Sequence, residues 1–156
     1  MSNHFTITTI GRIYVFLPSS VDVETQLTYI RKILREIYSV SRDRVVIALE
    51  PLPRDAGMAV SVIYDEIWRC QIYVNDDNEQ VLLESKNWCS LYGTDLSYEQ
   101  KQEIVTCNRR LDLYCGPDEE HTYDHDFEML TQFLQLNFKS RFAFDPSQHR
   151  FVVSEI

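Results

Sequence analysis

The chain has 156 residues, of which 44% are hydrophobic and 25% charged, with only four Gly and five Pro. This composition predicts one globular domain over residues 1–156 and excludes collagenous, disordered and repeat-array proteins. The 24 acidic side chains outnumber the 15 basic ones and leave a net charge of −9. That charge argues against nucleic acid or an anionic membrane as the main ligand and favours a basic or neutral partner.

The N-terminal residues 1–17 alternate like a strand and lack the charged start, apolar stretch and cleavage site of a secretory signal. No stretch approaches the length of a membrane-spanning helix. We therefore expect a cytoplasmic protein. No cysteine pair has the C-x-x-C spacing of a zinc ribbon, and an even number of cysteines leaves disulfides open. In a reducing compartment the favoured interpretation is four small buried thiols, namely Cys70, Cys89, Cys107 and Cys115.

Hydrophobic periodicity in the N-terminal part predicts a strand, a helix and a second strand. Residues from Phe5 to Leu17 alternate with period two, and Pro18 ends the pattern. An amphipathic helix follows from about residue 22 to 39, with Asp22 as its N-cap. The continuous apolar run Val45–Leu49 predicts a strand buried on both faces. The inward positions of the helix are predicted to be Val23, Leu27, Ile30, Leu34 and Ile37.

The middle of the chain predicts a hairpin and two helices. Met58–Tyr64 and Ile67–Val74 are rich in β-branched and aromatic residues and are separated by a short polar turn. A first helix ends at Gly93, and Ser97 with Gln100 forms a capping box that opens a second. The inward positions of these helices are predicted to be Val81, Trp88, Leu91, Tyr92, Ile104 and Val105.

The C-terminal part predicts a strand over Arg110–Cys115, a helix from about 123 to 138, and a closing hairpin formed by Phe142–Phe144 and Phe151–Val153. We expect the helix to be buried on more than one side, because Met129 and Phe133 widen an apolar face made of Tyr123, Phe127, Leu130, Leu134 and Phe138.

The order strand, proline, polar loop, helix, strand occurs twice, at residues 13–47 and 111–144. The two copies share almost no residue identity, so a coincidence of pattern is the alternative. These elements predict an α+β fold, in which a layered sheet carries helices mainly on one face. Two β-α-β units in a ferredoxin-like or related arrangement are one way to build it.

The segment Asp118–Glu128, with the sequence DEEHTYDHDFE, concentrates carboxylates around two histidines. Carboxylates gather at helix N-termini because the free amides and the helix dipole favour negative charge, and this is the structural interpretation. The alternative is a metal-dependent enzyme in which His121, Asp124 and His125 bind a divalent transition metal. Because His121 precedes the expected helix start at Thr122, the two histidines do not form a helical pair.

Other enzyme signatures are missing from the sequence. It contains no phosphate-binding loop, dinucleotide fingerprint, nucleophile elbow or H-E-x-x-H motif. Asn75–Glu79 lacks the glycine of a calcium loop and is interpreted as a turn. Cys115 lies in an acidic stretch, which favours a buried thiol over a nucleophile. We expect no catalytic residue and no cofactor. Basic residues in and after the first helix indicate a solvated helix face or a small basic patch: Arg31, Lys32, Arg35, Arg42 and Arg44.

Three runs between Arg109 and Val152 carry a family resemblance: RRLDLYCGPD, DHDFEMLTQFL and FAFDPSQHRFV. In this order they resemble the C-terminal half of small uncharacterised bacterial proteins of the kind encoded beside secreted toxins, where cognate immunity proteins are found. The resemblance implies a non-enzymatic inhibitor that binds a toxin domain. No active residue is carried over, because this broad class shares no functional motif.

Toxin domains that cut nucleic acids are often basic, and an acidic protein is steered onto them by long-range attraction. Together with the resemblance, this predicts a protein-binding surface of carboxylates with aromatic anchors. A structural component of a phage or secretion apparatus is a further possibility. The predicted binding residues are Asp118, Glu119, Glu120, Tyr123, Asp124 and Asp126, with Asp76 and Asp77 if their turn lies on the same side, and Tyr114 as a second anchor.

Overall fold

The computed structural model describes residues 10–18, 23–55 and 57–154. Predictions for residues 5–9, for the N-cap at Asp22 and for the side chain of Val23 lie outside the described part. Its helices are α1 (Val23–Ile37), η2 (Tyr38–Ser41), η3 (Pro53–Asp55), α2 (Asn78–Tyr92), α3 (Tyr98–Thr106) and α4 (Asp124–Asn137). Its strands are β1 (Ile10–Leu17), β2 (Val45–Pro51), β3 (Met58–Tyr64), β4 (Trp68–Asn75), β5 (Arg109–Pro117), β6 (Phe142–Asp145) and β7 (Arg150–Val153).

The strands form one seven-stranded sheet in the order β2-β3-β4-β5-β1-β6-β7. Neighbours are antiparallel in the pairs β2–β3, β3–β4, β1–β6 and β6–β7. The predicted α+β class with a layered sheet is confirmed. The two strand-helix-strand segments are placed differently in this sheet: β5 and β6 have only β1 between them, whereas β3, β4 and β5 separate β1 from β2.

Contacts along the chain group the described residues into two compact units. The first holds residues 10–11, 23–55, 57–74 and 113–127, and the second holds residues 12–18, 75–112 and 128–154. We describe each unit by itself.

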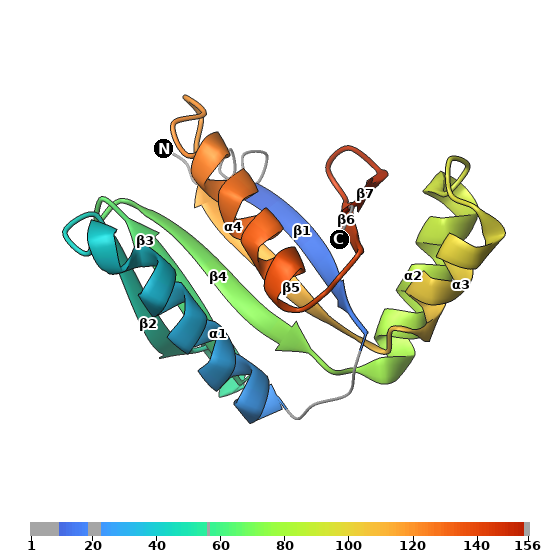
Figure 1. Ribbon diagram of the computed structural model, residues 1–156, viewed down its shortest axis with the longest axis horizontal. Coiled ribbons are helices and arrows are strands. Elements are labelled where there is room, and N and C mark those ends of the chain that lie inside the picture. The colour runs from blue at the N-terminus through green and yellow to red at the C-terminus, as the bar shows by residue number, and fades with distance from the viewer. Residues whose placement is uncertain (1–9, 19–22, 56, 155–156) are drawn as a thin grey trace. The chain divides into compact units, whose positions relative to one another are not determined.

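In the first unit, α1 packs on β2 and β3 and runs along them in Figure 1. Leu27, Ile30 and Leu34 are buried, as the three- and four-residue spacing predicts. Ile37 was also expected to face inward, but its side chain is exposed. The α-helix ends at this residue and continues as the short helix η2, so the periodicity no longer holds.

The prediction that both faces of β2 are buried is wrong. Val45 and Ile47 are buried, whereas Val46 is 49% exposed and Leu49 is 39% exposed. The strand lies at one end of the sheet order and pairs only with β3 among the described strands. A continuous apolar run therefore serves here as an edge strand with one covered face.

In the second unit, aromatic side chains cover one face of β1. The ring of Trp88, on α2, stacks on Tyr14 with centroids 5.2 Å apart and on Phe144 with centroids 4.4 Å apart. All residues from Ile13 to Leu17 are buried, so the opposite face of β1 is covered as well. The inward position expected for Leu91 is wrong, because this side chain is 65% exposed.

The ends of α2 and α3 follow the predicted local chemistry. The backbone N–H of Gly93 donates to the carbonyl of Cys89 and closes α2. Ser97 and Gln100 form the expected capping box of α3, with bonds of 3.1 Å and 2.8 Å to each other's backbone N–H groups. The two helices pack against each other, as Figure 1 shows. Ile104 is buried on α3.

The buried face of α4 differs from the expected one. Leu130 and Leu134 are buried, but Met129 is 49% exposed and does not widen the apolar face. Thr131 and Gln135 are buried in its place. These polar residues belong to the covered side of the helix, which hydropathy alone assigns to solvent.

All four cysteines are buried free thiols, as expected. Burial raises the pKa of Cys107 to about 11 and also raises the pKa of Cys115, which lies against Cys70. A thiol whose pKa is raised carries little thiolate, and the thiolate is the nucleophilic form. Cys115 is therefore unsuited to nucleophilic catalysis.

A buried ion pair lies in the second unit, at the start of β5. The Arg110 side chain is only 2% exposed, and its Nε donates to Asp112 Oδ1 at 2.6 Å. Its Nη1 lies 2.7 Å from Glu84 Oε1, and its guanidinium lies over the Tyr14 ring at 4.3 Å. The Asn75 amide donates to Asp112 Oδ2 at 3.2 Å.

Both charges of this pair are strongly influenced by burial. Burial raises the pKa of Asp112, and the neighbouring Arg110 opposes that rise. Burial acts to lower the pKa of Arg110, but Asp112 and Glu84 act the other way and the pKa is raised. The sequence run RLDLYC predicts an alternating strand, but its charged positions, Arg110 and Asp112, are as buried as its leucines.

Candidate functional site

The predicted binding segment connects β5 to α4 in the first unit, and Asp118 organises it. Its carboxylate accepts hydrogen bonds from the backbone N–H groups of Thr122 at 2.9 Å and Tyr123 at 2.7 Å. The N–H of His121, a residue with a φ of 59°, donates to the Asp118 carbonyl at 3.0 Å. Asp118 therefore provides the acceptor for two backbone N–H groups of the turn that leads into α4.

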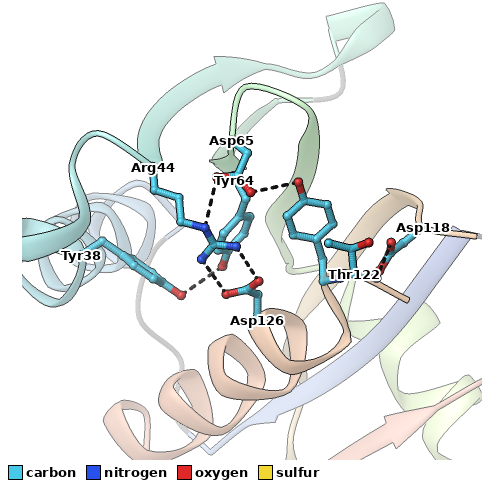
Figure 2. Close-up of polar contacts among 8 residues, drawn as sticks. Tyr38, Arg44, Tyr64, Asp65, Asp118, Thr122 and Asp126 are labelled. Atoms are coloured by element: carbon cyan, nitrogen blue, oxygen red, sulfur yellow. Dashed lines mark hydrogen bonds and ion pairs between the residues drawn. The ribbon is translucent and has the colours of Figure 1, made fainter. Parts of the chain in front are cut away.

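Arg44 binds two acidic residues that are distant from each other in the sequence. Its guanidinium donates to both carboxylate oxygens of Asp126, at 3.1 Å and 2.9 Å, and to Asp65 Oδ1 at 3.1 Å. Figure 2 shows it between the turn that joins β3 to β4 and the first turn of α4. The hydrogen bond to Asp126 is the main cause of the raised pKa of Arg44. A bidentate pair of this kind fixes orientation as well as distance.

Tyr123 is held by a stack on one face of its ring and by a hydrogen bond at its hydroxyl. Its ring stacks on Trp68 with centroids 5.0 Å apart and planes 1° from parallel. Its hydroxyl donates to Asp65 Oδ2 at 3.0 Å, a contact drawn in Figure 2. Burial raises its pKa, and the bond to Asp65 raises it further. Only 7% of Tyr123 is exposed, so it supports the segment from within rather than offering a free anchor.

Two tyrosines extend this network beneath Arg44. The hydroxyl oxygens of Tyr38 and Tyr64 lie 3.0 Å apart, and the Arg44 guanidinium is 5.6 Å from the centre of the Tyr64 ring. Burial raises the pKa of both hydroxyls. The acidic segment thus rests on a set of neutral phenols and one cation.

Within this segment, three of the predicted binding carboxylates are exposed: Glu119, Glu120 and Asp124. We call these three residues the acidic turn. Asp124 also pairs with His121, whose Nδ1 lies 3.0 Å from Asp124 Oδ2, and both side chains are largely exposed. The residues of the segment are therefore divided between an internal set, Asp118, Tyr123 and Asp126, and an outward set that solvent reaches.

The other predicted binding residues have separate roles. Asp76 and Asp77 belong to the second unit, where Asp77 accepts a hydrogen bond from the N–H of Gln80 at 3.1 Å and caps α2. Asp76 lies 3.7 Å from Arg109. Tyr114 is half-buried on β5.

The alternative metal site is not assembled in the described part of the chain. Within residues 10–18, 23–55 and 57–154, no group of three or more His, Cys, Asp or Glu side chains is arranged to hold a metal ion. His125 is exposed on the first turn of α4 and has no contact with the pair formed by His121 and Asp124 that the structure records. No described helix is long and apolar enough to cross a lipid bilayer.

Comparison with protein-family models, curated proteins and solved structures gives no match. The candidate site is therefore argued from its own geometry. Sequence reasoning missed five of its residues, namely Tyr38, Arg44, Tyr64, Asp65 and Trp68. Arg44 belongs to the basic residues in and after the first helix, and the others belong to an expected helix, strands and a turn. The one local signal is the charged pair Asp65 and Glu66 in the hairpin turn.

Replacing Asp118 with alanine tests whether this carboxylate holds the segment. We expect the free energy of unfolding to fall by about 1 kcal/mol, because the backbone N–H groups of Thr122 and Tyr123 lose their acceptor. Urea denaturation followed by circular dichroism measures it. Glu119→Ala is the matched control, because its exposed carboxylate has no hydrogen bond among the described residues, and it should leave stability unchanged. Equal effects of the two changes would contradict the role of Asp118 in holding this turn.

Proposed function

We propose that the protein is a non-enzymatic protein-binding module, an acidic inhibitor of the immunity type that acts in the bacterial cytoplasm on a basic toxin domain. The observation that carries this proposal is the acidic turn, in which Glu119, Glu120 and Asp124 are exposed on a segment whose internal contacts are complete. The net charge of −9 and the resemblance of the C-terminal part support the same function.

A segment whose backbone is already held in place suits the recognition of a basic surface. Ordering a flexible loop on binding costs free energy, and a segment already held by Asp118 and by the Arg44–Asp126 pair avoids most of that cost. Exposed charges act mainly on the rate of association, which long-range attraction accelerates and salt reduces. The acidic turn therefore supplies steering and orientation for a cationic partner.

A charge-reversal experiment tests the proposal. The protein is co-expressed with the product of the neighbouring open reading frame, and growth rescue and binding by calorimetry are measured. In the variant Glu119→Lys, Glu120→Lys, Asp124→Lys we expect binding to weaken by at least about tenfold and rescue to be lost. Asp118 is left unchanged because its carboxylate holds the turn before α4. Binding by the unchanged protein should weaken as salt rises.

The matched control reverses three exposed carboxylates outside the segment, in the variant Glu36→Lys, Asp95→Lys, Glu99→Lys. It changes the net charge by the same amount and should retain binding. Binding that is insensitive to salt and survives reversal of the acidic turn would contradict the proposal. So would stoichiometric zinc, manganese or iron that is lost from the His121→Ala, His125→Ala variant, because that result favours the metal-dependent enzyme.

A further inference from the structure

A hollow of about 420 Å³ lies in the first unit, where α1 ends and β2 begins. Its walls come from the last turn of α1, from η2 and the residue after it, and from the first residues of β2. The lining residues are Arg35, Tyr38, Ser39, Arg42, Val45, Val46 and Ile47. Three consecutive residues of β2 line it although neighbouring side chains of a strand point to opposite faces. The hollow therefore follows the edge of the sheet.

The register of β2 shows which backbone groups face this edge. The N–H of Asp65 donates to the carbonyl of Arg44, and the N–H of Leu52 donates to the carbonyl of Gly57. Both pairs fit the β2–β3 register, in which Val46 lies opposite Ile63. In an antiparallel pair, the residues that bond across the ladder alternate with those that do not. Even-numbered residues of β2 therefore bond to β3, and the N–H and C=O groups of Val45, Ile47 and Leu49 point outward.

The hollow carries positive charge on a protein of net negative charge. Arg35 and Arg42 are both exposed, and neither makes an ion pair with any side chain that the structure describes. Arg44, close by in the sequence, differs because Asp65 and Asp126 occupy its guanidinium. The outward backbone groups of β2 can pair with the backbone of an extended chain, and the two guanidinium groups beside them can bind carboxylates on that chain.

We propose that the edge of β2 binds an extended acidic peptide segment, which adds to the sheet as a further strand. Backbone groups of the segment pair with Val45, Ile47 and Leu49, and its carboxylates reach Arg35 and Arg42. Pro51 has no N–H and limits the strand at its far end. A second copy of β2 is a poorer occupant, because its sequence VVIALEP brings one carboxylate, Glu50. This site is independent of the acidic turn.

Fluorescence anisotropy with labelled peptides tests the proposal. The probe is a peptide of about seven residues that alternates Glu and Val, the length of an ordinary strand. We expect saturable binding that weakens as salt rises and is lost, by at least about tenfold, in Arg35→Glu, Arg42→Glu. A peptide that alternates Lys and Val should not bind. Glu119→Lys, Glu120→Lys, Asp124→Lys should bind the acidic peptide as the unchanged protein does.

Changes that remove backbone N–H groups distinguish strand addition from simple charge attraction. Leu49→Pro removes an outward N–H and should weaken binding by about 3- to 10-fold, the value of one hydrogen bond, whereas Leu49→Ala should retain it. Of two probe peptides N-methylated at alternate residues, at least one should fail to bind. The proposal is overturned if the Glu–Val peptide shows no saturable binding, if both methylated peptides bind as tightly as this parent peptide, or if sedimentation shows a dimer that Leu49→Pro dissociates.

Discussion

Replacing Asp112 with alanine is expected to lower the free energy of unfolding by about 3–5 kcal/mol, because it leaves a buried cation without its partner. The Arg110 side chain is almost fully buried, and Asp112 accepts two of its N–H groups. The amide of Asn75 loses its acceptor as well. Glu84 is partly exposed and replaces only part of the lost interaction. Urea denaturation followed by circular dichroism provides the measurement.

The matched control removes both charges together. In Arg110→Met, Asp112→Leu both fully buried charges are removed, and apolar side chains of similar volume take their places. Glu84 loses its partner, but its carboxylate is partly exposed and keeps contact with solvent. Removing a complete buried pair is often neutral or stabilising, so we expect the double variant to be clearly more stable than Asp112→Ala. A double variant that is less stable than the single one would show that the pair itself, rather than the avoidance of a lone charge, stabilises this unit.

The substitution Trp68→Ala is expected to lower the free energy of unfolding by about 3–5 kcal/mol, as large-to-small changes of buried aromatic residues do. Trp68 is buried on β4 and stacks on Tyr123. Its Nε1 donates to the carbonyl of Gly116 at 3.0 Å, so the change also leaves that carbonyl without this donor. Thermal or urea unfolding followed by circular dichroism measures the loss.

Trp68→Phe distinguishes packing from hydrogen bonding at this position. The phenyl ring keeps an aromatic surface for Tyr123 but has no N–H for Gly116, so we expect a smaller loss than in Trp68→Ala. If the two variants lose the same stability, the stack on Tyr123 contributes little. The comparison bears on the candidate site, because Tyr123 lies in the same segment as the acidic turn and is buried against Trp68.

Most elements were predictable because their signals are local. The helix at residues 23–37 follows from apolar spacing, and the start of α3 follows from Ser97 and Gln100, which contact each other three residues apart. Burial was less predictable, because it depends on the neighbour that an element receives. Val46 and Leu91 are apolar residues left exposed by the position of β2 at the sheet edge and by the outer face of α2.

In the candidate site, too, contacts between neighbouring residues were predictable and contacts between distant residues were not. The hydrogen bonds of Asp118 are a local feature, because its partners are four and five residues away. The pair between Arg44 and Asp126 joins residues 82 positions apart, and hydropathy carries no information on such a contact. The buried pair of Arg110 and Asp112 was not predictable for another reason. Alternation in a strand assigns residues to two faces, but it does not indicate whether both faces are covered.

The four buried thiols make local unfolding of the protein measurable by chemical modification. An alkylating reagent reaches Cys70, Cys89, Cys107 or Cys115 only when the surrounding side chains separate, because each is buried in the folded chain. Cys70 and Cys115 belong to the first unit, whereas Cys89 and Cys107 belong to the second. Mass spectrometry of the modified peptides therefore records the opening of each unit separately, without any introduced label.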